Sequence, residues 1–362
     1  MFVEVNGARL YFDAEGSGLV PHGPDMREKP TLFLLHGGPG ADHTIYKPAF
    51  STLSDIAQVI YLDHRGNGRS SGDDPATWNL AQWGDDVRGF CDALGIEHPI
   101  VFGASFGGFV AQSYATRHPE HPAKLILAST AARMNFPSVF DAFERLGGVE
   151  ARRVAEAYWL LPSSETRKRY RDICVPLYWA RPSVGNHVLS RAIIRDDVAI
   201  HFNGPANEQG RMDFRQALQT IQCPVLIMSG DLDPITPTAF SEEIACCLPR
   251  HLVRFETFPG MRAHRSGRRP GARLHSAARF HCCRLLDLVA MPGGFGPSGT
   301  PRASSGDEGP MPSSDIATPA RVAALPTLRE AVRVWARIGC LSFGGPAAQI
   351  ALLRREAVEQ RA

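Results

Sequence analysis

A serine with the surroundings of a nucleophile stands in the sequence GASFGG, residues 103–108. The motif follows an apolar run at 99–102, which predicts a strand, and precedes a pattern at 106–117, which predicts a helix. At such a turn the oxygen of Ser105 projects from the sheet edge towards the positive end of the helix, and the glycines give the crowded backbone room. The alternative is a serine that caps a helix, with glycines for packing. The position between strand and helix favours a nucleophile.

A nucleophilic serine needs hydrogen-bond donors for the oxyanion that its attack creates, and HGGPG at residues 36–40 can supply one. At a glycine the backbone N–H approaches a substrate without interference from a Cβ. We predict that the N–H groups of Gly38 and Phe106 form the oxyanion pair. A plain turn is the alternative, but HGGPG ends a predicted strand, and ligands bind at the carboxyl ends of strands in α/β sheets.

The carboxylate that would orient a catalytic base is predicted in GDLDP, residues 230–234, at the end of another apolar strand. Asp233 is favoured over its rival Asp231, because Pro234 would fix the turn so that the preceding carboxylate points back across the sheet edge. A chain order of Ser, Asp and then His is one that serves nucleophilic catalysis in an α/β sheet.

These residues must be positioned by a sheet, and short β-branched runs that recur between helical patterns predict one that is mostly parallel. We predict an α/β fold with eight strands, at residues 2–5, 9–14, 31–36, 59–63, 99–103, 125–129, 225–229 and 252–255. The dipeptide at 6–7, Asn-Gly, favours a tight hairpin between the first two strands. Helices are predicted at 80–94, with Trp83, Val87, Phe90 and Leu94 on one face, and at 106–117.

Composition divides the chain into four parts. Residues 1–130 and 220–259 form the predicted core, and 131–219 break the rhythm of strands and predict an inserted helical cap. Residues 260–320 carry many Arg and then many Gly, Pro and Ser, which predicts a disordered linker that cannot bury enough apolar area. Residues 321–362 regain helical periodicity and predict a short helical tail.

The overall composition is that of a soluble globular protein. Hydrophobic residues make up 44% of the chain, and Lys+Arg 39 against Asp+Glu 37 leaves a net charge of +2, so neither nucleic acid nor an anionic membrane is expected as a partner. The first residues resemble no secretory signal, which predicts the cytoplasm. The eight cysteines lack zinc-site or disulfide spacing, so we expect reduced thiols. A mechanism that uses a nucleophilic serine needs neither a metal nor an organic cofactor.

Four motifs together resemble the α/β-hydrolase fold, and within it the proline iminopeptidase group and its esterase-like relatives. They are HGGPG at 36–40, DHRGNGRS at 63–70, GASFGG at 103–108 and GDLDP at 230–234. The resemblance covers about residues 1–259. It implies a sheet with an inserted cap, a serine mechanism without a cofactor, and a peptide with a free N-terminal proline or another small amide or ester as substrate.

The family binds the free amine of its substrate with carboxylates of the cap. Four glutamates of this chain are available for that role, and no motif singles one out: Glu144, Glu150, Glu156 and Glu208. His64 and Arg65 are interpreted as structural residues that brace the loop after the fourth predicted strand.

The catalytic histidine of the family lies in a Gly-His loop just after the last strand, and this chain departs from that pattern. Here Pro259-Gly260 is followed by MRAHR, which makes His264 the predicted base and His275 the second choice. The abrupt change to Arg, Gly, Pro and Ala indicates a change of reading frame near codon 260. About 35 residues of the tail, including LSFGGPAAQIAL at 341–352, resemble the amino terminus of chromate-transporter proteins. An amphipathic tail that packs on the rest of the chain is the alternative.

The sequence therefore predicts a serine hydrolase in which Ser105 attacks, His264 transfers the proton, Asp233 orients the imidazole, and Gly38 and Phe106 bind the oxyanion. Small molecules or peptides are its expected substrates. A carboxylesterase or lactonase is the alternative within enzymes. The alternative outside them is a product of a frameshifted gene that keeps its nucleophile and lacks its base.

Overall fold

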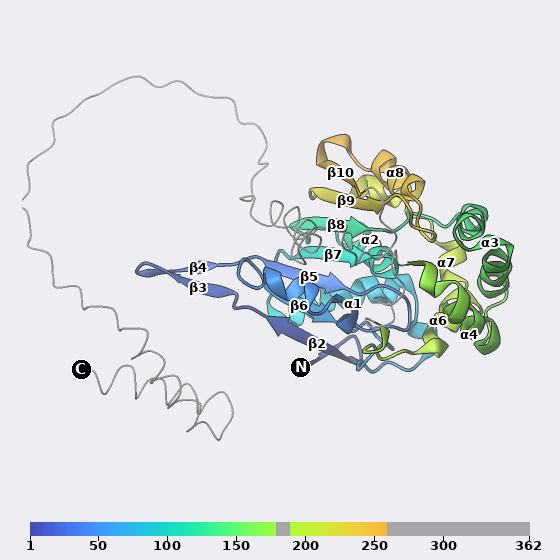
Figure 1. The fold of residues 1–362 in the computed structure, drawn as a ribbon. Helices are drawn as coiled ribbons and strands as arrows, with labels where there is room; N and C mark the ends of the chain where they lie inside the picture. The colour runs from blue at the N-terminus through green and yellow to red at the C-terminus, as the bar shows by residue number, and fades with distance from the viewer. Residues whose placement is uncertain (179–188, 259–362) are drawn as a thin grey trace, which may run out of the picture. The chain divides into compact units, whose positions relative to one another are not determined.

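The computed structural model describes residues 1–178 and 189–258, and Figure 1 shows these residues as a sheet with helices around it. Eight strands form the sheet in the order β1-β2-β6-β5-β7-β8-β9-β10. Their bounds are β1 Phe2–Val5, β2 Ala8–Glu15, β5 Thr31–Leu35, β6 Gln58–Leu62, β7 Ile100–Ala104, β8 Lys124–Ala128, β9 Val225–Gly230 and β10 Val253–Phe258.

The sheet is mostly parallel, as predicted. The strands β6, β5, β7, β8, β9 and β10 pair in parallel, whereas β2 pairs antiparallel with both β1 and β6. The predicted hairpin across residues 6–7 is confirmed, because Val5 pairs with Ala8 and both Asn6 and Gly7 have positive φ. All eight predicted strands are present, and β10 runs three residues further than the predicted end.

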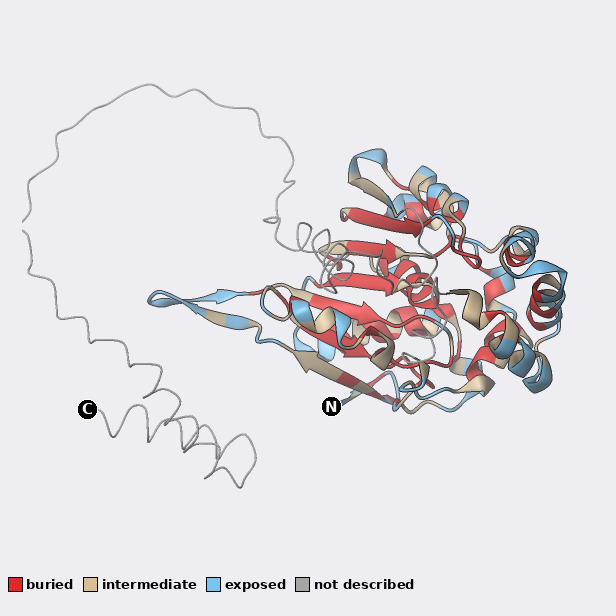
Figure 2. Cartoon of the chain, in the orientation of Figure 1, coloured by how far each residue is buried: buried red, intermediate tan, exposed pale blue. Residues whose placement is uncertain are grey.

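One pair of strands was not predicted. The strands β3, Leu19–His22, and β4, Asp25–Glu28, form a two-stranded antiparallel hairpin that lies outside the main sheet. Figure 2 shows this hairpin largely pale blue, and every residue of β4 is exposed. A strand that is exposed on both faces needs no hydrophobic alternation, so its sequence carries no periodic signal.

Alternate residues of the strands enter two separate cores. On one face, Phe33 and Leu35 pack with the helices α1, Leu80–Leu94, and α2, Phe106–Arg117. On the other face, Leu32 and Leu34 pack near the short helices η1, His43–Tyr46, and η2, Ala49–Leu53. Both faces of the central strands are therefore buried, which fits their nearly continuous apolar sequences.

The predicted bounds of α1 and α2 agree with the structure. On α1, Trp83, Val87 and Phe90 are fully buried, as expected for one apolar face. Leu94 lies on the same face by its spacing, but 41% of its surface is exposed. Leu94 is the last residue of the helix, which ends at Gly95 in the left-handed conformation and turns away from the core.

A helical insertion lies between β8 and β9. Its longer helices are α3, Phe136–Leu160, α4, Ser164–Ile173, and α6, Asp196–Asn203, with the short α7, Glu208–Arg211, and the 3-10 turn η4, Val175–Tyr178. Figure 1 shows α3, α4, α6 and α7 gathered beyond the carboxyl ends of the central strands. The predicted boundaries of core and cap, near residues 131 and 219, stay predictions.

The remaining helical elements are three 3-10 turns and the helix α8. They are η3 Pro75–Thr77, η5 Ala217–Thr220, α8 Thr238–Cys247 and η6 Arg250–Leu252. The five described cysteines, Cys91, Cys174, Cys223, Cys246 and Cys247, are free thiols. In the ranges 1–178 and 189–258 we find no helix with the length and apolar character needed to cross a membrane. The predicted linker 260–320, the tail 321–362 and the chromate-transporter resemblance lie outside the described residues.

Candidate active site

Ser105 occupies the turn between β7 and α2 in an unusual backbone conformation. Its φ is 52° and its ψ −120°, a region that costs a residue with a side chain about 1–3 kcal/mol. The turn is held on both sides: the Ser105 amide donates to the Ala128 carbonyl at 3.0 Å, and its carbonyl accepts from the Thr130 hydroxyl at 2.9 Å. Ser105 has the N-cap position of α2, but its side chain makes no capping hydrogen bond. The helix-cap alternative therefore does not explain this serine.

The glycines of the motif are required by close backbone contacts. A Cβ on Gly107 would lie 2.7 Å from the carbonyl oxygen of His36, and closer still to that of Leu35. A Cβ on Gly103 would lie 2.8 Å from the amide nitrogen of Gly108. Real Cβ atoms essentially never come this close to backbone, so only glycine lets α2 start directly against β7 and the end of β5.

The predicted oxyanion donors lie beside the serine. Gly38, Phe106 and Ser105 line one cavity of about 210 Å³. Phe106 is the first residue of α2, so its amide has no partner within the helix. Among the described residues neither the Gly38 amide nor the Phe106 amide donates to another protein group. Two free N–H groups beside a serine are what a developing oxyanion needs.

Two buried histidines, His36 and His64, each contact a predicted oxyanion donor or the residue next to one. The His36 ring accepts from the His64 amide through Nε2 at 3.3 Å, and its Nδ1 donates to the Gly37 carbonyl at 3.1 Å. The His64 ring packs edge-on against Phe106, with ring centroids 5.5 Å apart. Burial lowers the pKa of both imidazoles, so both are neutral at pH 7. Their fixed, neutral rings fit the structural interpretation of His64.

Arg65 has a structural environment as well. Its side chain is buried and makes a two-pronged ion pair with Asp86, with both N···O distances 2.8 Å. It also donates to the carbonyl of Asn6 at 3.0 Å. Arg65 thus ties the loop after β6 to α1 and to the turn of the first hairpin.

Asp233 is buried in the turn after β9, whereas its rival Asp231 is exposed. The Asp233 carboxylate accepts from the amides of Ile235 at 2.8 Å and Thr236 at 2.9 Å, and from the Thr236 hydroxyl at 2.9 Å. Burial raises the pKa of Asp233, although these hydrogen bonds and one from Ser129 act to lower it. Because Ser129 follows the residue that binds the Ser105 amide, and Ile235 lines the Ser105 cavity, Asp233 lies near the nucleophile.

The predicted base cannot be placed in the same way. His264 and the second choice His275 both lie outside the described residues, as does the proposed change of frame near codon 260. The strand β10, which in the sequence precedes them, pairs with β9 up to Phe258 and Gly230. The chain therefore reaches residue 258 beside the strand that leads to Asp233.

The helical insertion covers the cavity of Ser105 with aromatic and cationic side chains. Tyr158 and Trp159 come from α3, and Arg167 and Arg171 come from α4. Burial acts against the charge of Arg167, but Tyr158 and Asp196 raise the pKa of its guanidinium. Within the described part of the wall, no Asp or Glu lines the cavity.

The four glutamates that the resemblance suggested for amine binding have other partners. Glu144 and Glu156 pair with Arg152 at 2.9 Å and 2.8 Å, and Glu150 pairs with Arg169 at 2.7 Å. Glu208 accepts from the Leu80 amide at 3.2 Å. None of the four belongs to the described wall of the cavity. The sequence analysis did not single out Arg167 and Arg171, although both line the cavity. Their spacing of four residues on a predicted helical segment places them on one face of a helix and could have drawn attention to them.

Comparison with known proteins agrees with this geometry. The family described as alpha/beta hydrolase fold matches residues 30–260. The proline iminopeptidase PfmaB of Pestalotiopsis fici is 30% identical over 254 residues, which are 67% of this chain and 86% of that protein. The chain belongs to the α/β-hydrolase family.

Solved structures show the same fold at lower identity. A thermophilic esterase from Thermogutta terrifontis superposes with a TM-score of 0.57 at 24% identity, covering 80% of this chain and 100% of the esterase. The enol-lactonase from Burkholderia xenovorans LB400 gives a TM-score of 0.54 at 21% identity, with coverage of 80% and 100%. At this identity the comparison shows the α/β-hydrolase fold alone.

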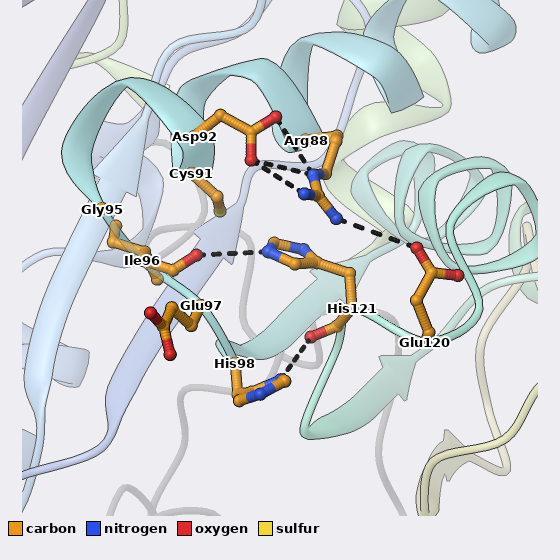
Figure 3. A pocket seen from close by; sticks show the side chains of 9 residues that line it. All are labelled: Arg88, Cys91, Asp92, Gly95, Ile96, Glu97, His98, Glu120 and His121. Atoms are coloured by element: carbon orange, nitrogen blue, oxygen red, sulfur yellow. Dashed lines mark hydrogen bonds and ion pairs between the residues drawn. The ribbon is translucent and has the colours of Figure 1, made fainter.

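A second cavity of the α/β-hydrolase core, of about 400 Å³, lies at the amino ends of β7 and β8, away from Ser105. Figure 3 shows that several of its polar side chains already have partners: Arg88 pairs with Asp92 and Glu120, and His121 bonds to the Ile96 carbonyl. Burial raises the pKa of the Cys91 thiol to about 12, which makes it a poor nucleophile. Among the described residues that line it, this cavity shows no catalytic arrangement.

A buried trio of Asp42, His43 and Asp63 has the composition of a metal site. Its ligand atoms are already bound by protein, however. His43 donates to Asp63 at 2.7 Å, and Asp42 accepts from the Arg69 guanidinium at 3.0 Å and from the Ile193 amide at 3.2 Å. These contacts join the loop after β5 to the helical insertion of the α/β-hydrolase, which explains the trio without a metal ion.

Proposed function

We propose that this α/β-hydrolase is a serine hydrolase that cleaves a small ester, lactone or amide through an acyl-enzyme. The observation that carries the proposal is that Ser105 lies in a strained turn and lines a cavity together with Gly38 and Phe106. A serine held at positive φ, with a side chain that does not cap its helix, is arranged to present its hydroxyl to a substrate. The backbone hydrogen bonds of Ser105 and the close packing of the neighbouring glycines hold the serine in this strained conformation.

In the proposed mechanism the Ser105 oxygen attacks the acyl carbonyl while its proton passes to His264. The Gly38 and Phe106 amides stabilise the oxyanion, and the proton then passes to the leaving group, which departs. Asp233 orients the imidazole and stabilises its charge. A water molecule, deprotonated by the same histidine, releases the acyl group and restores Ser105.

Two substrate classes follow from different observations. Similarity to a proline iminopeptidase favours a peptide with a free N-terminal proline. The cavity wall favours the carboxylesterase or lactonase alternative, because its ionisable side chains include Arg167 and Arg171 and none of the glutamates expected to bind an amine. We give the second observation more weight, since it concerns the residues that would touch the substrate.

Active-site labelling tests the proposal directly. The full-length protein is incubated with a fluorophosphonate probe, and the modified residue is identified by mass spectrometry. We expect stoichiometric modification of Ser105, together with turnover of 4-nitrophenyl esters that exceeds turnover of L-proline 4-nitroanilide. An unmodified Ser105 and no turnover of any substrate would instead favour a product that has lost its base.

A further inference from the structure

Two guanidinium groups of α4 line the cavity that also contains the nucleophile. Arg167 and Arg171 are four residues apart, which places them on the same face of the helix, and both line the cavity that contains Ser105. Arg169 lies between them in sequence, pairs with Glu150 and does not line the cavity. The helix therefore presents two cations to the cavity and a third to another surface.

One carboxylate is shared between the two cavity cations. Asp196, at the start of α6, accepts from Arg167 Nε at 3.2 Å and also binds Arg171 Nη1. With no Asp or Glu in the described wall, this leaves about one positive charge uncompensated beside the cavity. Only 17% of the Arg167 side chain is exposed, so solvent screens this charge less than it would at the surface.

A buried hydroxyl beside these cations is arranged to donate. Tyr158 is fully buried, and its oxygen accepts from Arg167 Nη1 and from Asn203 Nδ2, both at 3.0 Å. The Asn203 nitrogen is identified by its second bond, which it donates to the Ala199 carbonyl at 3.0 Å. With two donors already directed at the Tyr158 oxygen, its own proton needs an acceptor, and no described residue supplies one. Tyr158 lines the cavity.

We propose that the substrate of the Ser105 site carries a carboxylate, which binds Arg171, Arg167 and the Tyr158 hydroxyl. The inference rests on the proposed hydrolase function and narrows its substrate class to acyl compounds with an anionic end. A planar carboxylate accepts two hydrogen bonds from a guanidinium and one more from a hydroxyl. A substrate amine at the same place would meet a net positive charge.

Matched esters test the proposal at pH 7.5 and constant ionic strength. The substrates are 4-nitrophenyl hydrogen adipate, which carries a carboxylate, and 4-nitrophenyl methyl adipate, in which a methyl ester removes that charge. We expect the wild-type protein to have a higher kcat/KM for the acid. In Arg171→Gln the ratio of kcat/KM for acid over methyl ester should fall about tenfold or more, because the carboxylate loses a charge-assisted hydrogen bond.

Two further variants separate a binding role from a general charge effect. Arg169→Gln removes the same charge from the same helix but away from the cavity, and its ratio should stay within about twofold of wild type. Arg171→Lys keeps the charge without the fork-shaped donor set and should retain part of the preference. An equal fall in Arg169→Gln and Arg171→Gln, or a wild-type preference for the methyl ester, would overturn the proposal.

Adipate binding provides a test that does not need turnover. Calorimetry should detect adipate binding to the wild-type protein, and binding about tenfold weaker or more to Arg171→Gln, with neutral dimethyl adipate as the comparison ligand. If Ser105 is not labelled and no ester is cleaved while adipate still binds through Arg171, the hydrolase proposal fails and the anion site stands. Absence of adipate binding together with an unchanged substrate ratio rejects the anion site alone.

Discussion

The turn around Ser105 and the helical insertion line the same cavity, yet they are held together in different ways. Around the serine, backbone packs on backbone: the positions of Gly103 and Gly107 admit no Cβ, and the Ser105 amide and carbonyl are both bonded. In the insertion, the wall consists of side chains such as Arg167 and Arg171 that share Asp196. The first arrangement tolerates almost no substitution, whereas the second can change one residue at a time.

This difference separates the chemistry from the selectivity. An oxyanion and a nucleophile need positions fixed to a fraction of an ångström, which packed backbone provides. Recognition of one end of a substrate needs only a suitable charge and hydrogen-bond set. We therefore expect substitutions at the turn to abolish activity or destabilise the fold, and substitutions in the insertion to change which substrate is used.

Removal of the nucleophile should have the largest effect. Ser105→Ala should lower kcat/KM by about 10⁴-fold or more, because the covalent step is lost. The melting temperature should stay the same or rise, since alanine removes little packing. Turnover is measured with a 4-nitrophenyl ester and the fold by circular dichroism. Activity near the wild-type level in purified material would show that Ser105 is not the nucleophile.

Replacement of the buried carboxylate should separate activity from stability. Asp233→Asn can still accept from the amides of Ile235 and Thr236, so the turn should remain intact. Activity should fall by about 10⁴-fold, because an amide cannot hold the imidazole in the required tautomer. A comparable loss should not occur in Asp231→Asn, whose carboxylate is exposed. Equal losses in the two variants would contradict the assignment to Asp233.

The same variant tests the electrostatics of the turn. Burial raises the folded-state pKa of Asp233, so its contribution to stability is fully present below its unfolded pKa of about 3.9 and is lost as pH rises through the higher folded value. Asparagine does not titrate in this range. The free energy of unfolding of Asp233→Asn should therefore improve relative to wild type between pH 4 and pH 8. A difference that does not change with pH would show that this pKa is not raised.

Crowding at the turn should lower the free energy of unfolding measurably. In kcal/mol this effect should be smaller than the loss of activity in Ser105→Ala. Gly107→Ala places a methyl group against the carbonyl oxygens of Leu35 and His36, and we expect about 3 kcal/mol of destabilisation. Gly95→Ala is the matched control, because Gly95 has positive φ but no atom within 4 Å of the position that a Cβ would take; it should cost about 1–2 kcal/mol. Denaturant unfolding measures both. A smaller loss in Gly107→Ala than in Gly95→Ala would show that the turn adapts.

Sequence patterns predicted the backbone-held region far better than the insertion. The glycine motifs, the eight strands and the bounds of α1 and α2 are local signals, because each depends on neighbours in the chain. The partners of Arg167 are not local: Asp196 lies 29 residues away, and the cavity forms only when α4 and α6 pack together. For the same reason the glutamates of the insertion looked available for an amine, while the structure pairs them with arginines of α3, α4 and α7.

The smallest effect is expected at those glutamates. The carboxylate of Glu144 lies 2.9 Å from Arg152, and 43% of its side chain is exposed. Glu144→Gln should therefore change the free energy of unfolding by less than about 0.5 kcal/mol, as exposed ion pairs contribute little. Because Glu144 does not line the described wall of the cavity, KM should stay within about twofold for both an ester and L-proline 4-nitroanilide. The comparison variant Glu150→Gln should have equally small effects on stability and KM, because Glu150 binds Arg169, which does not line the cavity. A tenfold rise in KM confined to the proline substrate would mean that Glu144 reaches the substrate amine, and the insertion would then select a cation where we expect an anion.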